Sequence, residues 1–282
     1  MTKLKILLPL FNDWQSLELL LQKINNLFKK SKIFIEVIIV NDKSTSKFKL
    51  SKNYSKIRKI RIIDLNKNLG SQKAIFIGLH YIYKNNNKST IVVMDSDGED
   101  DPLKIISLMK KVKNNPNYFI FVKRTKRLEN FFLKFLNKIR LIITYLLTGK
   151  YLNIGNFSAF HSNLLKSILT NKDLSLAYCS GVIKNYHKLI FLGFPKKKRF
   201  YGNSKVNFLF LFKHSINIIS VFYKSVLLRT FILFLLSLLY LNNNQFIIFF
   251  VILIFNIILA ANYFFNRDFK HRKVIKNVKI IK

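Results

Sequence analysis

An acidic cluster stands out in a chain that otherwise carries few carboxylates. The segment Asp95-Ser96-Asp97-Gly98-Glu99-Asp100-Asp101 holds five of the 13 acidic residues. Carboxylates this close together repel one another unless water or a cation neutralises them. Asp95, Asp97 and Glu99 alternate, so an extended backbone would direct them to one side. Their oxygens suit a hard ion such as Mg²⁺ or Mn²⁺, and we therefore predict metal chemistry for Asp95 and Asp97.

The other two acidic residues of the cluster have a simpler interpretation. Asp100 and Asp101 directly precede Pro102, where a helix is expected to begin, and acidic side chains stabilise helix N-termini. An EF-hand fits poorly, because Gly98 is misplaced in the loop and Ile106 stands where a bidentate glutamate is needed.

Two further polar segments follow predicted strands. In Asn41-Asp42-Lys43-Ser44, Asp42 could accept hydrogen bonds from a ribose or a base, although Asp and Ser are also ordinary turn residues. In Asn68-Leu69-Gly70, Gly70 suits a left-handed turn, and Ala74 and Gly78 beyond it would let a helix pack closely on a sheet. Taken singly, each segment is equally compatible with a structural role.

The elements that would position these residues alternate between strands and helices. Short β-branched or aromatic runs bounded by polar residues predict buried strands, and these are Lys5–Pro9, Phe34–Val40, Ile60–Leu65, Thr90–Met94 and Tyr118–Val122. Apolar residues at helical spacing predict helices between them, at Trp14–Lys30, Ser71–Tyr83 and Pro102–Lys113. The alternation predicts an α/β fold, with a mostly parallel sheet covered by helices on both faces. Ligands of such sheets bind at the carboxyl ends of the strands.

The C-terminal part is different in character. Thr230–Asn266 contains no Asp, Glu, Lys, Arg or His over 37 residues. One helix of that length would measure about 55 Å, too long for a single crossing of a ~30 Å hydrocarbon layer. The polar run at 242–245 divides it, so we predict a transmembrane hairpin of Leu227–Leu241 and Phe246–Phe265. A buried helical hairpin in a soluble protein is the alternative.

Basic residues predict the orientation of this hairpin. They flank it on both sides, at Lys213, Lys224 and Arg229 before it and at seven positions from Arg267 onward, whereas the connecting turn carries none. The positive-inside rule then places both termini in the cytoplasm, with the protein in the inner (cytoplasmic) membrane. Asn207–Tyr223 could lie flat in the membrane interface.

The overall charge narrows the classes of partner. The chain has 282 residues, with 49 Lys and Arg and a formal net charge of +36, which favours anionic partners such as nucleic acid, phosphorylated substrates or an acidic membrane. The basic residues are dispersed and show no binding-module pattern, so we predict no nucleic-acid partner. The single cysteine, Cys179, excludes an intrachain disulfide framework and a cysteine-based zinc site.

The order of the polar motifs resembles family 2 glycosyltransferases. The motifs are Leu8-Pro9-Leu10-Phe11-Asn12-Asp13, Val40-Asn41-Asp42-Lys43-Ser44, Asn68-Leu69-Gly70 and Asp95-Ser96-Asp97. The resemblance covers about residues 3–125 well and extends loosely to about 230. It is similar above all to polyprenyl-phosphate hexosyltransferases, such as dolichol-phosphate mannosyltransferase and bactoprenol glucosyltransferase.

Those enzymes pair a GT-A domain with membrane segments, and the resemblance implies four regions here. Residues 1–206 would be the GT-A domain, with a nucleotide-sugar half at about 1–125 and an acceptor half at about 126–206. Residues 207–225 would be an interfacial segment, 226–266 two transmembrane helices and 267–282 a basic cytoplasmic tail.

The resemblance also implies roles for residues of the donor half. Asp95 and Asp97 would be catalytic, holding the nucleotide diphosphate through the divalent metal, with Glu99 near that metal. The nucleotide-sugar pocket would comprise Pro9, Leu10, Asn12, Asp13, Asp42, Lys73, Asp95, Ser96 and Asp97.

Cationic and polar residues of the second half would face the acceptor phosphate. The acceptor site implied by the resemblance comprises Arg124, Arg127, Asn156, Arg199, Ser204 and Lys205. No role is predicted for Lys196–Lys198, since a run of charges is usually a solvated surface.

The chain departs from the family pattern at several positions. Asp13 replaces the usual Glu, Asn41 and Lys43 replace Asp and Gly, and Gly98 replaces an apolar residue and could loosen the metal loop. Asn156 stands where many relatives carry Asp. An amide cannot act as a general base, and a phosphate acceptor needs none, so Asn156 favours a phosphate over a sugar hydroxyl.

The resemblance therefore implies an inverting, metal-dependent glycosyltransferase. It would move a sugar from a UDP- or GDP-sugar to a polyprenyl phosphate at the cytoplasmic membrane face, for cell-surface glycan synthesis. Two alternatives stay open: transfer to a growing lipid-linked glycan, and a nucleotidyltransferase on a similar fold. The sequence does not identify the sugar, the nucleotide or the lipid, and it does not reveal the oligomeric state.

Overall fold

The computed structural model describes most of the chain. The described residues are 2–46, 50, 54–85, 88–125, 131–202, 208–240, 245–267, 269 and 271–281. Arg127, Ser204 and Lys205, which the sequence analysis assigned to the acceptor site, lie outside these ranges.

The described strands form one eight-stranded sheet with the order β7-β5-β6-β4-β1-β2-β3-β8. The strands are β1 (Lys3–Leu10), β2 (Phe34–Asn41), β3 (Ile57–Leu65), β4 (Thr90–Val93), β5 (Phe119–Arg124), β6 (Ile154–His161), β7 (Leu189–Phe194) and β8 (Ile275–Ile280). Neighbours β4-β1-β2-β3 are parallel, as are β5 and β7, whereas β6 and β8 run antiparallel to their neighbours. The predicted α/β fold with a mostly parallel sheet is therefore confirmed.

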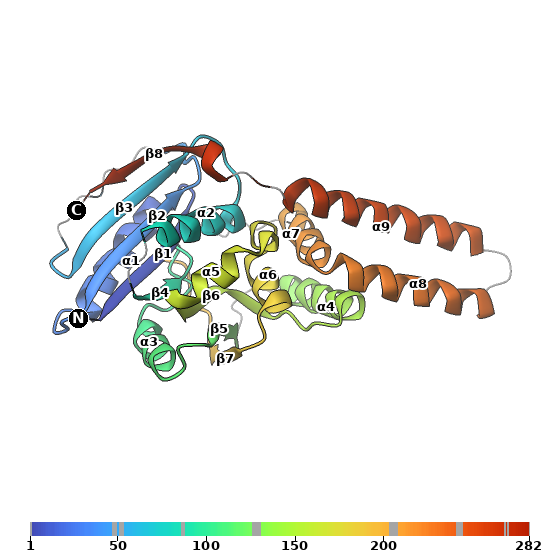
Figure 1. The fold of residues 1–282 in the computed structure, drawn as a ribbon, viewed down its shortest axis with the longest axis horizontal. Helices are drawn as coiled ribbons and strands as arrows, with labels where there is room; N and C mark the ends of the chain where they lie inside the picture. Colours follow the sequence, from blue (N-terminus) through green and yellow to red (C-terminus); the bar gives the residue numbers. More distant parts are fainter. Residues whose placement is uncertain are drawn as a thin grey trace.

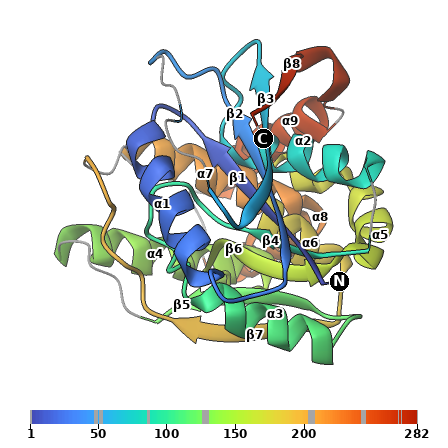
Figure 2. The same ribbon diagram turned by 90° about the vertical axis from the view of Figure 1, so that its left-hand side faces the viewer.

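Helices cover both faces of the sheet (Figures 1 and 2). Helices α1 (Trp14–Leu27) and α3 (Lys104–Asn114) pack on one face, and α2 (Ser71–Lys84), α5 (Leu165–Leu169) and α6 (Tyr178–Asn185) on the other. Strands buried on both faces must be apolar along their whole length, which explains the continuous runs in the sequence. The two 3-10 turns η1 (Ser162–Leu164) and η2 (Lys172–Ser175) join the later elements.

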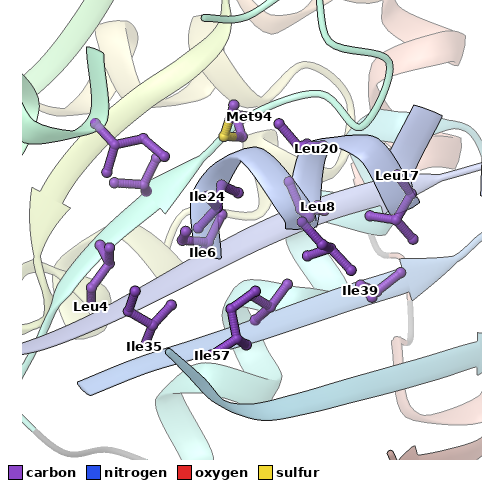
Figure 3. Packing of buried hydrophobic residues seen from close by; sticks show 14 of the residues in the cluster. Leu4, Ile6, Leu8, Leu17, Leu20, Ile24, Ile35, Ile39, Ile57 and Met94 are labelled. Carbon is purple, nitrogen blue, oxygen red and sulfur yellow. The ribbon is translucent and has the colours of Figure 1, made fainter. Parts of the chain in front are cut away.

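Alternate residues of β1 supply the two halves of the core. Ile6 and Leu8 face Leu17 and Leu20 of α1 (Figure 3), whereas Leu7 belongs to the cluster under α2. All five side chains are fully buried, and each contributes ~1.5–3 kcal/mol of apolar transfer free energy.

Close packing of α2 on the sheet depends on the glycine that the sequence singled out. A Cβ atom at Gly78 would run into the Leu7 side chain and come within 3.0 Å of Val40. Glycine at this position therefore lets the helix approach the sheet, as predicted.

Two helices project from the α/β body as an antiparallel pair, α8 (Tyr223–Tyr240) and α9 (Gln245–Arg267) (Figure 1). Within the described residues, Phe246–Arg267 alone is a straight helix long and apolar enough to cross a membrane, with a mean hydropathy of 2.5. Helix α7 (Phe208–Val221) passes the same test only together with α8, and the two are bent by 91°. Helix α4 (Phe131–Thr148) packs beside α7 and α8.

The segment after α9 differs from the free basic tail that the resemblance implied. A short 3-10 turn, η3 (His271–Val274), leads into β8, which pairs with β3 along Arg61–Leu65 at the edge of the sheet. The sequence analysis missed this strand because Ile275-Lys276-Asn277-Val278-Lys279-Ile280 is short and rich in lysine. Lysine is a common residue on edge strands.

Candidate active site

A cleft of about 980 Å³ opens where β1, β2 and β4 end. This is the edge at which ligands of parallel sheets bind. Its lining combines residues of the two predicted halves with side chains from α4 and α7. Of the predicted site residues it includes Pro9, Leu10, Asp13, Asp42, Asp95, Ser96, Asp97, Glu99, Arg124, Asn156 and Arg199.

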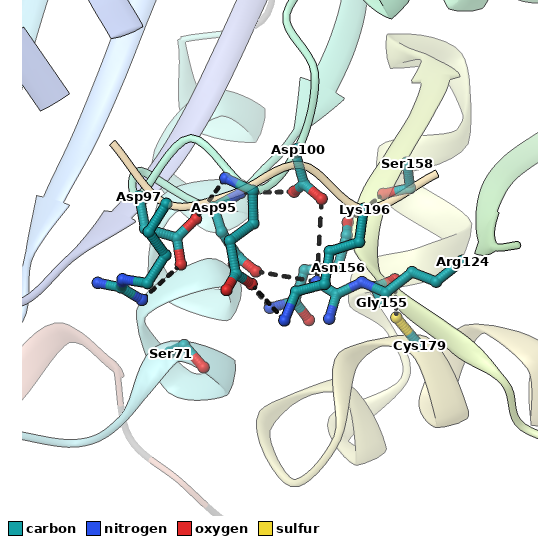
Figure 4. A network of polar contacts seen from close by, with 12 residues as sticks. Ser71, Asp95, Asp97, Asp100, Arg124, Gly155, Asn156, Ser158, Cys179 and Lys196 are labelled. Atoms are coloured by element: carbon teal, nitrogen blue, oxygen red, sulfur yellow. Dashed lines mark hydrogen bonds and ion pairs between the residues drawn. The ribbon is translucent and has the colours of Figure 1, made fainter. Parts of the chain in front are cut away.

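The acidic loop after β4 forms one wall of the cleft, and Asp95, Asp97 and Asp100 are held there by polar contacts (Figure 4). Asp95 accepts a hydrogen bond from the Asn156 amide at 3.0 Å and lies 3.7 Å from the guanidinium of Arg124. Asp97 accepts a hydrogen bond from Arg199 at 2.8 Å, and Glu99 is paired with Lys196 at 2.9 Å.

The three predicted metal ligands, Asp95, Asp97 and Glu99, each contact a different amide or cationic group. Among the described residues, no group of three or more His, Cys, Asp and Glu side chains is arranged to hold a metal ion. Mg²⁺ nevertheless commonly uses only one or two carboxylates and completes its shell with water and substrate phosphates. Asp97, with Asp95 nearby in the same cleft, fits that ligand set.

Asp101 lies next to the helix start, where the sequence analysis expected it, whereas Asp100 has a different role and α3 begins two residues later than predicted, at Lys104. The buried Asp100 carboxylate accepts a hydrogen bond from the backbone N–H of Asp95 at 3.0 Å, which closes the loop. Asp101 accepts from the N–H of Leu103 at 3.1 Å, just before α3 begins.

Burial changes the protonation behaviour of this loop. It raises the pKa of Asp97 to about 7, assisted by the nearby carboxylates of Asp95 and Glu99, while Arg199 acts in the opposite direction. Burial likewise raises the pKa of Asp100 to about 7. A buried carboxylate that stays this basic binds a cation readily once it is ionised.

A basic strap, residues 196–200, lies along the acidic loop. Besides the Lys196–Glu99 ion pair, the N–H of Lys197 donates to Glu99 O at 2.9 Å and the N–H of Phe200 to Asp97 O at 3.0 Å. The sequence analysis gave the lysines of this strap no role. The sequence signal was the presence of one concentrated basic run and one concentrated acidic run in the same chain. Their opposite charges could have suggested that the two segments pair.

The strap also explains the unusual Gly98. This residue has φ +86°, and a Cβ atom on it would collide with the Phe200 ring. Gly98 therefore permits the strap to pack against the acidic loop. This packing accounts for the glycine without the looser metal loop that the sequence analysis expected.

Arg199 lies between Asp13 and Asp97 in the cleft. Its guanidinium bridges Asp97 Oδ2 at 2.8 Å and Asp13 Oδ2 at 3.0 Å. In this arrangement it neutralises the two donor-side carboxylates, whereas the resemblance had implied a contact with the acceptor.

The predicted nucleotide residues are held by backbone contacts. Both oxygens of the buried Asp42 carboxylate accept backbone hydrogen bonds, from Leu69 and Gly70, each at 2.7 Å. Burial raises the pKa of Asp42, and these two hydrogen bonds partly offset the effect. The Ser96 hydroxyl donates to Pro9 O at 2.9 Å. Asp42 thus fixes the turn before α2 in addition to lining the cleft.

Two residues predicted to bind the nucleotide do not line the cleft. Asn12 Oδ1 accepts from the backbone N–H groups of Thr45 and Ser46 at 2.8 and 3.2 Å, so it organises a loop. Lys73 donates to Asn266 Oδ1 at 3.1 Å and lies over the Phe269 ring, because its position on α2 directs it to the C-terminal end of α9 and the residues just beyond it.

The sequence analysis missed several residues where the cleft meets the apolar helices. Arg140 and Asn137 of α4 and His214 of α7 line the cleft there, with Leu211 and Ile218. The sequence offered little signal for them, since Arg140 and His214 are only two of several polar residues in these mainly apolar helices. They lie far along the chain from every motif, and only the fold brings them to the acidic loop.

The chain matches the family model of glycosyl transferase family 2 over residues 5–170. It is 25% identical over 211 residues to the uncharacterized glycosyltransferase sll0501 of Synechocystis sp., covering 73% of this chain and 65% of that protein. It is 24% identical over 214 residues to the undecaprenyl-phosphate 4-deoxy-4-formamido-L-arabinose transferase of Photorhabdus laumondii, covering 73% and 64%. The chain thus spans somewhat less than two thirds of these relatives.

Solved structures share the fold at low sequence identity. Glucosyl-3-phosphoglycerate synthase from Mycobacterium tuberculosis, crystallised with Mn²⁺, uridine diphosphate and phosphoglyceric acid, matches with a TM-score of 0.57 at 11% identity, over 80% of this chain and 78% of that one. Mannosyl-3-phosphoglycerate synthase from Rubrobacter xylanophilus matches with a TM-score of 0.53 at 13% identity, over 78% and 72%. The domain therefore has a GT-A-like fold. With the family match covering more than half of its length, the chain belongs to glycosyltransferase family 2.

Proposed function

We propose that this enzyme transfers a sugar, with inversion, from a nucleotide-sugar to a polyprenyl phosphate at the cytoplasmic face of a membrane. One observation carries the proposal: a single cleft joins the acidic loop after β4 to Arg140 of α4 and to apolar side chains of α7, two helices with exposed apolar residues. Family membership argues against the alternative of a nucleotidyltransferase.

The donor would bind at the acidic end of the cleft. Asp97, assisted by Asp95, would hold a divalent ion, and a bound ion would stabilise the negative charge that develops on the departing diphosphate. The fold neighbour crystallised with Mn²⁺ and uridine diphosphate supports this class of donor. Arg199 would have to leave Asp97 for the ion to reach both oxygens, and its guanidinium would then be free to contact phosphate.

The acceptor would enter from the side of the apolar helices. Arg140 lines the cleft from α4, and Arg124 lines it beside Asp95 of the acidic loop. The two guanidinium groups would hold a phosphate in place for attack on the anomeric carbon. Asn156 cannot take a proton there. Its amide nitrogen donates to Asp95, and its oxygen accepts from Gln72 at 3.2 Å. An acceptor that is already ionised matches this site better than a sugar hydroxyl does.

The membrane would lie against α4, α7 and the α8–α9 pair. Exposed apolar side chains are concentrated on these helices, such as Leu146 of α4, Leu209 of α7 and Phe246 of α9, which are 61%, 73% and 80% exposed. Patches of this kind mark membrane or protein contacts. The sheet receives β8 directly after α9, which favours a hairpin with both ends on the side of the catalytic domain. The name of the Photorhabdus relative, an undecaprenyl-phosphate sugar transferase, supports a lipid phosphate acceptor.

The proposal is tested with membranes that contain the full-length protein. They are incubated with a panel of radiolabelled UDP- and GDP-sugars and Mg²⁺, and lipids are then extracted into organic solvent. We expect label from one donor in an acid-labile lipid fraction, and none with the Asp97→Asn variant. Label only in a glycan that resists mild acid would contradict the phosphate acceptor, and transfer by folded, inserted Asp97→Asn would contradict the role of Asp97.

A further inference from the structure

A chain of polar contacts supports the loop after β2 from the side away from the cleft. Asn41, at the end of β2, lies opposite Asp64 at the end of β3. Its amide nitrogen donates to Asp64 Oδ1 at 2.8 Å, and its oxygen accepts from the N–H of Ser44 at 3.0 Å. The Ser44 hydroxyl then accepts from the N–H of Asn12 at 2.9 Å. These contacts connect Asp64 to both loops at the donor end of the cleft.

The second oxygen of Asp64 is bound from the opposite direction. Lys279 of β8 lies 2.9 Å from Asp64 Oδ2, and the Asp64 side chain is only 14% exposed. Asn277 stands opposite Asp64 in the β3–β8 ladder, so Lys279 reaches Asp64 across the diagonal on the same face of the sheet. The segment after the apolar helix pair thus supplies the cation for a carboxylate behind the donor loop.

The loop after β2 contains backbone conformations that are unfavourable without surrounding contacts. Lys43 has φ 56° and Asn12 has φ 60°, a region that costs non-glycine residues energy and persists only where surrounding contacts enforce it. Asp42, between Asn41 and Lys43, lines the cleft and fixes the N–H groups of Leu69 and Gly70.

We propose that Asp64 is a positioning residue for the donor nucleotide, with Asn41 as the link and Lys279 of β8 as the counter-ion. The inference rests on the proposed function, which assigns the Asp42 side of the cleft to the nucleotide. It gives β8 a role in donor binding in addition to completing the sheet. It also explains why an amide stands at position 41. The side chain there must donate a hydrogen bond to Asp64 and accept one from the N–H of Ser44, and an amide can do both.

The geometry allows a test by exchange of the two side chains. In Asn41→Asp, two carboxylates would face each other at hydrogen-bond distance and one bond would be lost. In the double variant Asn41→Asp/Asp64→Asn, the carboxylate at 41 would still accept from Ser44 and would receive a hydrogen bond from the amide at 64. The double variant therefore restores the link with the two groups interchanged.

The measurement is binding of radiolabelled UDP and GDP, each with Mn²⁺, to the purified full-length protein by equilibrium dialysis. For the nucleotide that the wild type binds, we expect Asn41→Asp to weaken affinity ~10-fold and the double variant to recover most of it. In transfer assays the donor KM should rise while kcat changes little, as for a lost binding contact. Thermal unfolding of each variant provides the folding control.

Matched controls separate this role from general effects of charge. Lys279→Met should weaken nucleotide binding, whereas Lys276→Met, an exposed lysine on the same strand, should not. Glu36→Gln removes a carboxylate from the opposite end of β2, where it binds Arg61 at 2.6 Å, and should leave nucleotide affinity unchanged. Should Asn41→Asp not fold, Asp64→Ala tests the same link and should weaken binding ~10-fold.

The outcomes distinguish this inference from the proposed function. If the wild type binds neither nucleotide, the donor site and the inference both fail. If the wild type binds but Asn41→Asp or Asp64→Ala binds equally well, the positioning role is wrong while the proposed function stands. The same conclusion follows if the exchanged double variant is no better than Asn41→Asp.

Discussion

At the scale of single residues, Arg199 occupies the Asp97 oxygen that a divalent ion bound through both carboxylate oxygens would use. The Arg199 guanidinium lies 2.8 Å from Asp97 Oδ2 and also binds Asp13. A metal ion bound through both oxygens of Asp97 would have to displace it. Free enzyme and donor-bound enzyme are therefore expected to differ in the position of this side chain.

Replacing Arg199 should separate ion binding from turnover. In Arg199→Gln we expect Mn²⁺ alone to bind more tightly than to the wild type, because its competitor is gone. Sugar transfer should nevertheless fall, because a phosphate-binding cation is lost. Electron paramagnetic resonance of free Mn²⁺ measures the first effect, with the exposed Lys188→Gln as control. Equal or weaker Mn²⁺ binding in Arg199→Gln would contradict the competition.

The protonation of Asp97 predicts a pH dependence. Burial raises the pKa of Asp97 to about 7, so below that pH the carboxyl holds a proton that a metal ion must displace. Mn²⁺ affinity should rise with pH up to about 7 and level off above 8. The same measurement on Asp97→Asn should show a much flatter profile, and an equally steep one would assign the titration to another group.

The residues that line the cleft could be predicted where they belong to sequence motifs. They could not be predicted where contacts between distant parts of the chain determine the direction of a side chain. Asp95, Asp97 and Asp42 do line the cleft, because strand ends converge in any parallel sheet. Lys73 turned toward Asn266 instead, since the sequence cannot tell which side of a helix start faces the ligand. Arg140 and His214 lie outside every motif, and only the folded chain brings them to the cleft.

At the scale of elements, α4 combines an exposed apolar surface with a polar contribution to the cleft. Ile142, Tyr145 and Leu146 are 49%, 52% and 61% exposed, whereas Arg140 lines the cleft. A helix of this kind can lie in a membrane interface with its apolar side in lipid. It would then hold the cleft at the depth of a lipid phosphate.

Polar substitutions on α4 should impair use of the lipid only. In Ile142→Gln/Leu146→Gln we expect a higher KM for polyprenyl phosphate in liposomes and an unchanged affinity for nucleotide, because the substituted surface is apart from the donor. Ile106→Gln on α3, a residue 49% exposed, is the matched control. An unchanged lipid KM in the α4 variant would show that this surface does not contact the membrane.

At the scale of the whole molecule, the apolar pair α8–α9 is tied to the catalytic domain at both ends. Helix α7 and α4 contact it on one side, and β8 follows α9 into the sheet. The hydropathy of the sequence predicted the apolar pair, but β8 was missed because it is short and rich in lysine, and its partner strand β3 is distant in the chain. Pairing between distant strands depends on the complete fold.

This arrangement predicts which parts of the chain are reachable from outside the cell. In a Cys179→Ser background, Asn243→Cys between the two helices should react with a membrane-impermeant maleimide in intact cells. Lys276→Cys on β8 should react only after the membrane is opened. Labelling of both positions in intact cells, or of neither, would contradict a hairpin whose two ends lie in the cytoplasm and whose turn lies outside.

The position of β8 in the chain has a consequence for biosynthesis. The ribosome makes β3 long before β8, and domains generally fold as they emerge, so the outer edge of β3 must wait until both apolar helices have been synthesised. During that interval Asp64 lacks its lysine and the edge lacks its neighbour. A nascent chain would therefore acquire its finished donor loop only after the apolar pair has been delivered to the bilayer, which would delay full activity until the enzyme has reached its lipid.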